Sequence, residues 1–527
     1  MDVGQLPSAM VIYPINDVHC PYIMDYAVLA AFILYFALVL YVGYYFYNRS
    51  HNMEDYILGG RSMNPYVTAL SAQASDMSSW LLMGLPGSIM LMGLGEVWIG
   101  IGLAVGSYLS WLFAAKKIRK HSVVAGNALT LPQFYANRFK DKSGVISLIC
   151  SVIILFFFTI YVASGFKGCG TILVTIFPGL ELTLAMMVGA AIIIAYTLMG
   201  GYKAVCWTDF FQAILMVVAV IVVPLAAMGH LGGWSEVSAS LSAVYDGNFL
   251  DLFSDGGEKM APLAIMSLLA WGFGYFGMPH IVVRYMSIRH PEEVKVARRV
   301  SLVWIVVALT AVCFIAVTGR AYLIEQGYTF VNGGVLDPSG ASYNPENIFV
   351  TMAGDLFVPI VAGFLFAAVM AAIMSTADSQ LLVASSSITN DLLGGRFGLT
   401  DSKLMWLSRI VVVIVAILAL VLALFGGDNI MGLVSYAWAG FGAAFGPLTI
   451  LALYWKRMNF YGAVATMVVG FITVVAWKYT LASTGIYELL PGFFFALFAG
   501  IIVSLITPAP SDEILQEFDD AQNYVEE

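Results

Sequence analysis

A carboxylate and several hydroxyls stand together in one apolar stretch of the chain. The segment SAQASDMSSW, residues 71–80, lies within the apolar run Thr68–Met92 and contains Asp76. A charge at mid-membrane costs about 2.5–3.5 kcal/mol on insertion scales, so Asp76 should face the protein interior and have a partner. This run holds no Lys or Arg, so the partner is distant in sequence or is an ion. Alternatively, Asp76 accepts hydrogen bonds from backbone N–H groups freed by a helix break.

Hydroxyls and free carbonyls around an aspartate suit a hard cation, which prefers oxygen ligands. A local unwinding near Ala74–Met77 would release such carbonyls. A second polar segment, AAIMSTADSQ at 371–380, contains the adjacent Ser375 and Thr376, followed by Asp378. Such hydroxyls are often bonded to the preceding helical turn instead, so both readings stay open.

Four aromatic residues lie in candidate core helices: Trp80, Tyr161, Trp271 and Tyr275. An aromatic side chain in a membrane helix more often serves packing or an interface belt than ligand binding. Trp271 and Tyr275 favour a site more strongly, because they flank glycines and stand four residues apart on one helix face.

The composition shows what must position these residues. Of 527 residues, 60% are hydrophobic and 11% charged, and the mean hydropathy is +0.86. A soluble protein lacks the polar residues to cover that much apolar side chain. Recurring runs of about 20 apolar residues predict an all-α polytopic membrane protein. No basic patch suggests nucleic acid, and the five scattered cysteines show no disulfide framework or metal spacing.

The hydropathy pattern predicts thirteen spans, with the N-terminus outside and the C-terminus cytoplasmic. Residues 1–25 hold no Lys or Arg, and the first apolar run is too long for a signal peptide. This topology puts every Lys and Arg on the inner side except Lys167, Lys259, Arg320 and Lys478. The expected spans are 26–48, 66–92, 97–115, 145–166, 183–200, 208–229, 261–287, 300–320, 346–380, 406–425, 431–454, 460–482 and 490–507.

Two of these spans are interrupted at matching positions. The second contains SDMSSW and then GLPG, and the seventh contains WGFGYFGMPH. Interrupted spans at corresponding positions of two halves indicate a transporter binding site, although Gly and Pro are common in membrane helices anyway. The chain then divides into an extracytoplasmic tail (1–25), a first helix and cytoplasmic loop (26–65), a five-helix repeat (66–229), an outer loop (230–260), a second five-helix repeat (261–454), two further helices (455–510) and an acidic cytoplasmic tail (511–527). Ser511 could cap a helix in this tail, but we expect it to be solvated.

Long stretches of the chain resemble the sodium/solute symporter family. The resemblance covers nearly all of residues 40–510 and is strongest to the bacterial proline carriers of that family. It implies a LeuT-like fold with a 5+5 inverted repeat, and secondary active transport. The stretches that carry it are DYILGGRSMNPYVTALSAQASDMSSWLLMGLPG, ALTLPQFYANRF, FFFTIYVASG, WTDFFQA, WGFGYFGMPHI, GLVSYAWAGFGAAFGP and YELLPGF.

The resemblance also implies the roles of individual residues. Its sodium site would use the carbonyls of Ala74, Met77 and Ala372 and the hydroxyls of Ser375 and Thr376, with the Asp76 charge acting on the site. Proline contacts would fall on Trp80, Gly84, Tyr161, Trp271, Tyr275 and Pro279. Arg61 matches an arginine linked to coupling, although an arginine beside a cytoplasmic loop is more often a plain topology signal.

Asp209 matches an acidic position near a second cation site of some relatives. Asp378 and Ser379 depart from the smaller, uncharged residues expected in the proline carriers. With Asp209 they could complete a second cation site or bind a proton.

The predicted function is Na⁺-coupled uptake of L-proline by alternating access in the plasma membrane of a bacterium. The alternative is Na⁺- or H⁺-coupled symport of another amino acid, pantothenate, a sugar or a sialic acid. A channel or a transport-linked sensor is a rival of another class. We expect no enzyme activity, because no nucleophile–base constellation or cofactor motif occurs. The expected partners are Na⁺, a small solute and the lipid bilayer, without an organic cofactor, nucleic acid or obligate protein partner.

Overall fold

The computed structural model describes residues 26–47, 52–177, 179–199, 201–331, 334–394 and 400–526. The expected outer tail at 1–25 lies outside these residues. The chain is mostly helical. Its helices are α1 (Tyr26–Tyr47), α2 (Met53–Leu58), α3 (Pro65–Asp76), α4 (Leu85–Met92), α5 (Val97–Leu109), α6 (Lys116–Val124), α7 (Leu131–Arg138), α8 (Val145–Ile176), α9 (Leu182–Met199), α10 (Tyr202–His230), α11 (Trp234–Leu241), α12 (Pro262–Leu269), α13 (Pro279–Ser287), α14 (Val294–Glu325), α15 (Ile348–Leu356), α16 (Pro359–Ser386), α18 (Asp401–Phe425), α19 (Ile430–Tyr454), α20 (Phe460–Thr480), α21 (Leu489–Ile506) and α22 (Asp512–Asn523).

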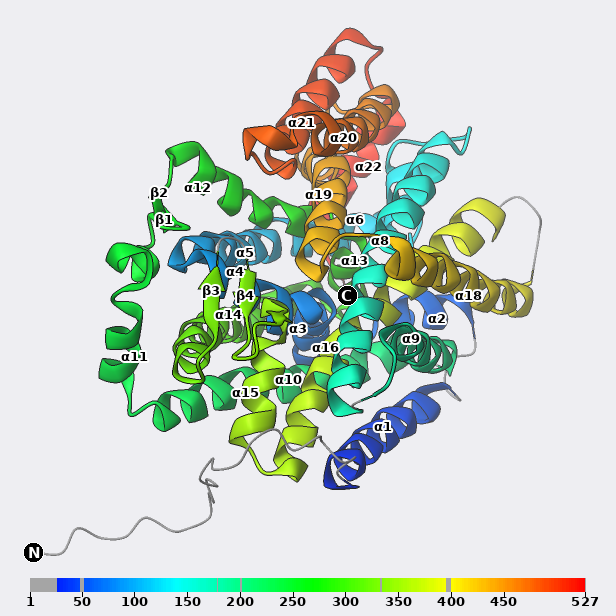
Figure 1. Cartoon of the computed structure of the whole chain (residues 1–527). Coiled ribbons are helices and arrows are strands. Elements are labelled where there is room, and N and C mark those ends of the chain that lie inside the picture. The colour runs from blue at the N-terminus through cyan, green and yellow to red at the C-terminus, as the bar shows by residue number, and fades with distance from the viewer. Residues whose placement is uncertain are drawn as a thin grey trace, which may run out of the picture.

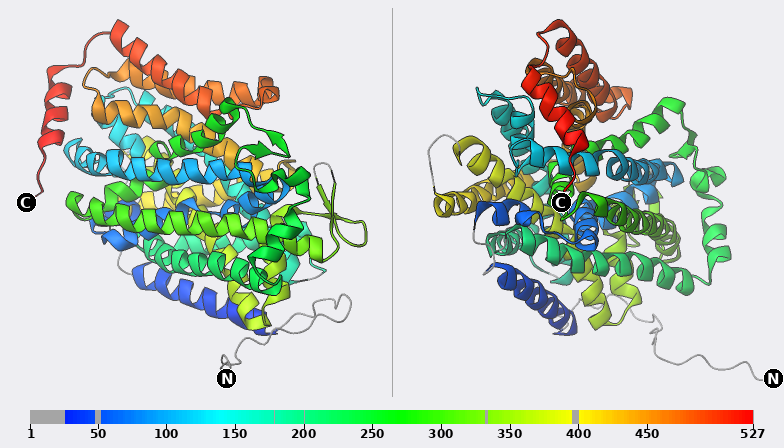
Figure 2. Two further views of the ribbon diagram at one scale, coloured as in Figure 1. Left: turned by 90° about the vertical axis from the view of Figure 1, so that its left-hand side faces the viewer. Right: turned by 180° about the vertical axis from the view of Figure 1, so that it is seen from behind.

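Five short strands interrupt the helical pattern in two loops. One antiparallel pair follows α11, and a three-stranded antiparallel sheet follows α14. The strands are β1 (Ser254–Asp255), β2 (Glu258–Lys259), β3 (Thr329–Val331), β4 (Gly334–Leu336) and β5 (Ser342–Tyr343). Figure 1 labels β1, β2, β3 and β4, and the left view of Figure 2 shows the strands at one end of the helical bundle.

Both interrupted spans are broken helices. α3 ends at Asp76, Met77 has φ −87° and ψ 80°, and the chain resumes as a π-helical turn, Trp80–Gly84, before α4. In the second case α12 continues as a 3-10 helix, Ala270–Phe276, and α13 restarts at Pro279 after a 45° bend. Pro279 fits the first turn of α13 because its missing N–H has no helical acceptor there.

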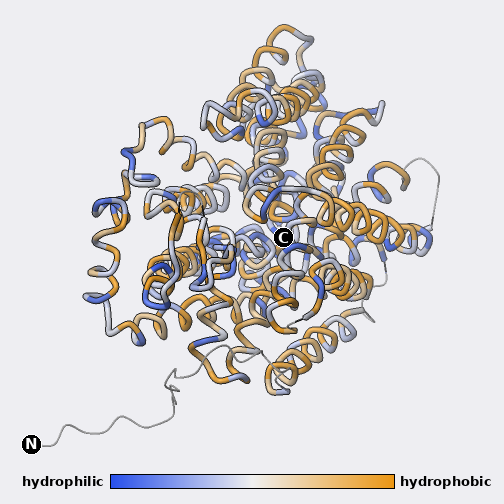
Figure 3. The backbone as a smooth tube through the Cα atoms, viewed as in Figure 1, coloured by the Kyte–Doolittle hydropathy of each residue, from blue (hydrophilic) through white to orange (hydrophobic). Residues whose placement is uncertain are grey.

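The helices run side by side through the molecule (Figure 2). α3 packs against α10, α13, α14 and α16, so the first broken helix lies at the centre of the bundle. Outer helices such as α18 are hydrophobic over most of their length, as the hydropathy colouring of the backbone tube shows (Figure 3). Ile414, Leu418 and Val421 of α18 are exposed, which is the pattern of a lipid-facing helix.

Within the described residues, ten helices are long and apolar enough to cross a membrane, or eleven if the bent pair at Pro262–Ser287 is one span. Two other predicted spans contain shorter apolar helices, Trp80–Met92 and Leu182–Leu198. The expected span at 346–380 is wrong in its bounds. α15 ends at Leu356, Pro359 starts a new helix, and α16 extends to Ser386.

The expectation of a solvated acidic tail is also wrong. Residues 512–523 form α22, which packs against α6 and buries Ile514, Phe518 and Ala521. Its carboxylates pair with basic residues of neighbouring segments, including Lys140 with Glu513 at 3.3 Å. Lys456 pairs with Asp519 in the same way. The tail sequence lacks a long apolar run, but its apolar residues recur on one helix face, and that face is buried.

Candidate functional site

Asp76 connects the two broken helices. Its carboxylate accepts a hydrogen bond from the Tyr275 hydroxyl, which lies on the 3-10 segment before α13. One residue earlier, the Ser75 carbonyl accepts a hydrogen bond from Nε2 of His280, at 3.1 Å. The partner of the mid-membrane carboxylate is therefore distant in sequence. The other carboxylate oxygen, Oδ1, has no hydrogen-bond partner among the described residues.

The backbone carbonyl of Asp76 accepts hydrogen bonds from aromatic side chains. It accepts the indole N–H of Trp80 at 3.0 Å and the hydroxyl of Tyr161 at 3.4 Å. The Ser78 N–H donates to the same carbonyl at 3.1 Å, because the helical ladder is broken there. Trp80, Tyr161 and Tyr275 are all buried. Three of the predicted proline-contact residues therefore converge on Asp76.

The other three predicted proline contacts each have different neighbours. They are Trp271, Gly84 and Pro279. The Trp271 ring stacks on Tyr487, with centroids 5.1 Å apart, and its carbonyl accepts the indole N–H of Trp438 at 2.7 Å. Gly84 lies one turn beyond Trp80, with Met431 beside its Cα. Pro279 lines a cavity of only 10 Å³ together with Arg284. Trp438 bonds the Trp271 carbonyl and also contacts the Tyr275 ring. Trp271 is therefore linked through Trp438 to the aromatic residues around Asp76.

A second set of oxygens joins α3 to α16. The Ser375 hydroxyl donates to the Ala74 carbonyl at 2.8 Å, and the Thr376 hydroxyl lies 3.4 Å from the same oxygen. The Ser375 hydroxyl also lies 3.1 Å from the Ala372 carbonyl. We call these four residues the bridge cluster. Met77 lies at the helix break, and no hydrogen bond among the described residues joins it to α16.

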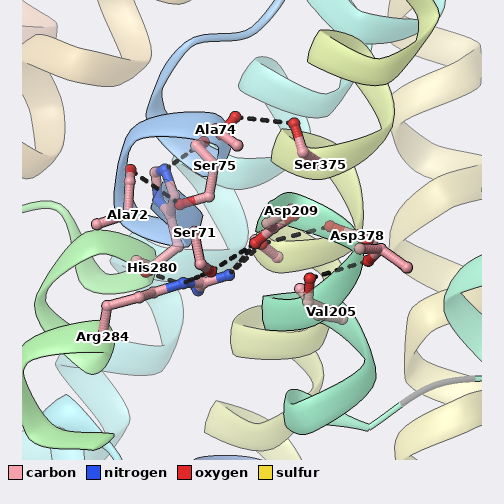
Figure 4. Close-up of polar contacts among 12 residues, drawn as sticks. Ser71, Ala72, Ala74, Ser75, Val205, Asp209, His280, Arg284, Ser375 and Asp378 are labelled. Atoms are coloured by element: carbon pink, nitrogen blue, oxygen red, sulfur yellow. Dashed lines mark hydrogen bonds and ion pairs between the residues drawn. The ribbon is translucent and has the colours of Figure 1, made fainter. Parts of the chain in front are cut away.

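A third set of polar groups surrounds Arg284, which sequence reasoning counted only as an inner-side charge. Its guanidinium pairs with the Asp209 carboxylate and donates to the Ser71 hydroxyl, both at 3.2 Å (Figure 4). It also donates to the Ser379 hydroxyl at 2.5 Å. Asp378 adjoins Ser379, whose hydroxyl lies 3.3 Å from its carboxylate. We call these five residues the arginine cluster. A basic residue inside the predicted span 261–287 was the signal for it.

Arg61 joins several segments at the end of the bundle that the sequence predicts to face the cytoplasm. Gly59, Gly60 and Arg61 all have left-handed φ angles of 67°, 61° and 48°, which turn the chain sharply between α2 and α3. The Arg61 guanidinium donates to Asn127, Ser122, the Ala128 carbonyl and the Met286 carbonyl, at 2.8–3.0 Å. Burial lowers the pKa of Arg61 to about 10, which leaves it charged at neutral pH. Arg61 therefore connects separate segments of the chain in addition to contributing to the charge bias of the loops.

Comparison with known proteins identifies the kind of molecule that carries these clusters. The profile of the Sodium:solute symporter family matches residues 56–470. The chain belongs to this family. It is 43% identical over 487 residues to the high-affinity proline transporter PutP of Bacillus subtilis, covering 92% of this chain and 99% of the relative. It is 40% identical to the sodium/proline symporter of Escherichia coli, covering 94% and 96% of the two chains.

Among solved structures, the fold is similar to that of a Na⁺-coupled sialic acid symporter in a substrate-bound outward-open state. The TM-score is 0.77 at 19% sequence identity, covering 93% of this chain and 99% of that chain. The expected family is thus confirmed, and the chain is a LeuT-like, multi-pass transporter of the plasma membrane and not an enzyme.

Proposed function

We propose that this transporter couples the uptake of L-proline to Na⁺ by alternating access. The observation that carries the proposal is the bridge cluster, in which hydroxyls of α16 meet a carbonyl freed at the break in α3. The substrate assignment rests on the named activity of relatives that share 40–43% of their residues with this chain over most of its length.

The bridge cluster supplies oxygens of the kind that Na⁺ binds. The carbonyls of Ala74 and Ala372 and the hydroxyls of Ser375 and Thr376 are neutral, buried and contributed by two helices. A hard cation prefers such oxygen ligands. Met77 would add its carbonyl, and Asp76, two residues beyond Ala74, would add a negative charge. In this proposal Na⁺ links α3 to α16 and fixes the break in α3.

Proline would bind where the two broken helices meet, beside Asp76. The freed N–H groups at the breaks suit the carboxylate of an amino acid, since half-helix N-termini attract anionic substrate groups. The faces of Trp80, Tyr161, Trp271 and Tyr275 suit its apolar ring. Gly84 and Pro279 would border the site on opposite sides. Because the aromatic residues are buried, proline entry requires them to move apart.

The topology proposed for the cycle has thirteen spans, with the N-terminus outside and the C-terminus cytoplasmic. Lys140, in the basic loop that follows α7, supports an inner location for α22, because it pairs with the α22 carboxylates of Glu513 and Glu517. In this proposal α3–α10 and α12–α19 form the two five-helix repeats. Arg61 acts as the inner latch, because it bonds both the 122–128 segment and the end of α13.

The test is uptake of labelled proline into proteoliposomes under imposed gradients of Na⁺, H⁺ or K⁺. A membrane potential of 100 mV supplies about 2.3 kcal/mol per charge, equivalent to an accumulation of roughly fiftyfold for a one-sodium cycle. Accumulation should follow the Na⁺ gradient, and only proline and close analogues should compete. Accumulation driven by H⁺ alone would refute the sodium assignment, and broad competition by other amino acids would refute the proline assignment.

A further inference from the structure

The arginine cluster already contains a cation of its own. The Arg284 side chain is 1% exposed, and its guanidinium bonds three other helices and one carbonyl of its own helix. It bonds Ser71 on α3, Asp209 on α10, Ser379 on α16 and the His280 carbonyl on its own helix, the last at 2.7 Å. Figure 4 shows the guanidinium lying between α13 and Asp209. Few oxygens near Asp209 therefore remain open to a second cation.

The charges of the cluster do not balance when every group is ionised. Asp209 and Asp378 are both fully buried, and Arg284 is the one arginine of the cluster. It pairs with Asp209, whereas Asp378 lies next to the Ser379 hydroxyl that Arg284 also bonds. Asp209 Oδ1 and Asp378 Oδ2 have no hydrogen-bond partner among the described residues. A buried unbalanced charge is costly, so the cluster must hold one further positive charge. A single proton on Asp378 satisfies this requirement while Arg284 remains paired with Asp209.

We propose that Arg284 is a tethered cation that takes the place of a second sodium ion between Asp209 and Ser379. The proposal rests on the proposed sodium-coupled function and assigns the second cation position of that same site. External Na⁺ then binds only at the bridge cluster. Removal of the guanidinium leaves two buried carboxylates and a hydroxyl, which together form an oxygen site for a second sodium ion.

The bridge cluster differs from the arginine cluster in the source of its positive charge. Its four oxygens belong to carbonyls and hydroxyls, and no basic side chain is bonded to them in the described part of the chain. A mobile cation is needed there to hold α3 against α16. In the arginine cluster the corresponding link between the two helices passes through Arg284, which bonds both Ser71 and Ser379.

The test counts sodium ions bound to the purified full-length protein at pH 8, with ²²Na⁺ as the probe. This measurement needs no proline, so an error in the substrate assignment does not affect it. The wild-type protein should bind one ion per chain, and Arg284→Gln should bind two. The double variant Asp209→Asn/Arg284→Gln should return to one, because it removes a carboxylate along with the guanidinium.

Two further variants distinguish failure of the bridge-cluster assignment from failure of the tethered-cation proposal. Arg119→Gln removes another arginine that is 1% exposed near the inner end, where it bonds the Ile288 carbonyl, and should leave the count at one. Ser375→Ala in the Arg284→Gln background should remove the bridge ion and leave the new one. If that variant keeps two ions, the bridge assignment fails while the tethered cation stands. A wild-type count of two, or an unchanged count in folded Arg284→Gln, would overturn the tethered-cation proposal.

Discussion

The bridge cluster and the arginine cluster use the same two helices and differ by one turn. On α3 the bridge cluster takes Ala74 and the arginine cluster takes Ser71. On α16 the first takes Ser375 and Thr376, and the second takes Asp378 and Ser379. One helical turn is about 5.4 Å, so two chemically different links lie side by side across one interface.

The difference lies in where the positive charge comes from. In the bridge cluster only neutral oxygens meet, and a cation from solution can complete it. In the arginine cluster a third helix, α13, delivers a guanidinium, so this link depends on the position of α13 and not on an ion concentration. A transporter built this way has one sodium-sensitive link and one that responds to movement of its broken helix.

The largest expected effect comes from removing both hydroxyls of the bridge cluster. Ser375→Ala/Thr376→Ala should raise the Na⁺ concentration for half-maximal proline uptake by about 100-fold, the upper range for disturbed metal sites. Each hydroxyl oxygen is a proposed ligand, and alanine supplies none. The measurement is proline uptake at graded Na⁺ concentrations. Ser386→Ala is the matched control, since the Ser386 hydroxyl bonds only the nearby Val383 carbonyl on the same helix. Equal Na⁺ dependence in the two variants would remove the bridge cluster from the mechanism.

A smaller effect is expected at Asp76, which lies beside the bridge cluster without bonding it. Asp76→Asn removes a charge and weakens the bond from Tyr275, and hydrogen bonds to charged groups are worth about 1.5–3 kcal/mol. The Na⁺ concentration for half-maximal uptake should rise about tenfold or more. Tyr275→Phe in the same background should add little, because the two groups act together. Full additivity of the two substitutions would show that they act separately.

Substitution of Arg61 tests whether its hydrogen bonds at the inner end of the bundle restrain both clusters. Arg61→Gln removes a charged donor from the end of α13, and loss of about 1 kcal/mol shifts an equilibrium roughly fivefold. Labelling of an Ala128→Cys reporter by an inner-side thiol reagent should accelerate by about that factor. The control is Ala128→Cys with Arg61 intact. Slower labelling in the Arg61→Gln background would contradict the latch.

The smallest effect on transport is expected from the C-terminal helix, which touches neither cluster. Phe518→Ala should release α22, because the Phe518 ring packs between Arg138 and His121, and limited proteolysis should then cleave the tail faster. The Na⁺ concentration for half-maximal uptake should stay within about twofold of wild type, because α22 packs against α6, away from both clusters, and distant sites act independently. A tenfold change would show that the tail controls the site.

Much of this arrangement could be predicted from residue order. Apolar runs located the long helices, the polar residues around Asp76 located the first break, and the glycines and Pro279 of the seventh span located the second. The meeting of Ser375 with Ala74 followed from the family resemblance. The arginine cluster was missed because a basic residue near an inner loop looks the same in sequence whether it faces solvent or Asp209. The docking of α22 was missed because its charge composition suggested solvent, whereas its buried face holds only three side chains.

The most direct test of the account is an electron cryo-microscopy map of the protein at high Na⁺, compared with one at the same concentration of K⁺. In the Na⁺ map but not in the K⁺ map, we expect density for an ion between the Ala74 and Ala372 carbonyls and the Ser375 and Thr376 hydroxyls. In both maps, Arg284 should be paired with Asp209. A continuous helix through Met77, separated from α16 and with no density between them in Na⁺, would contradict it.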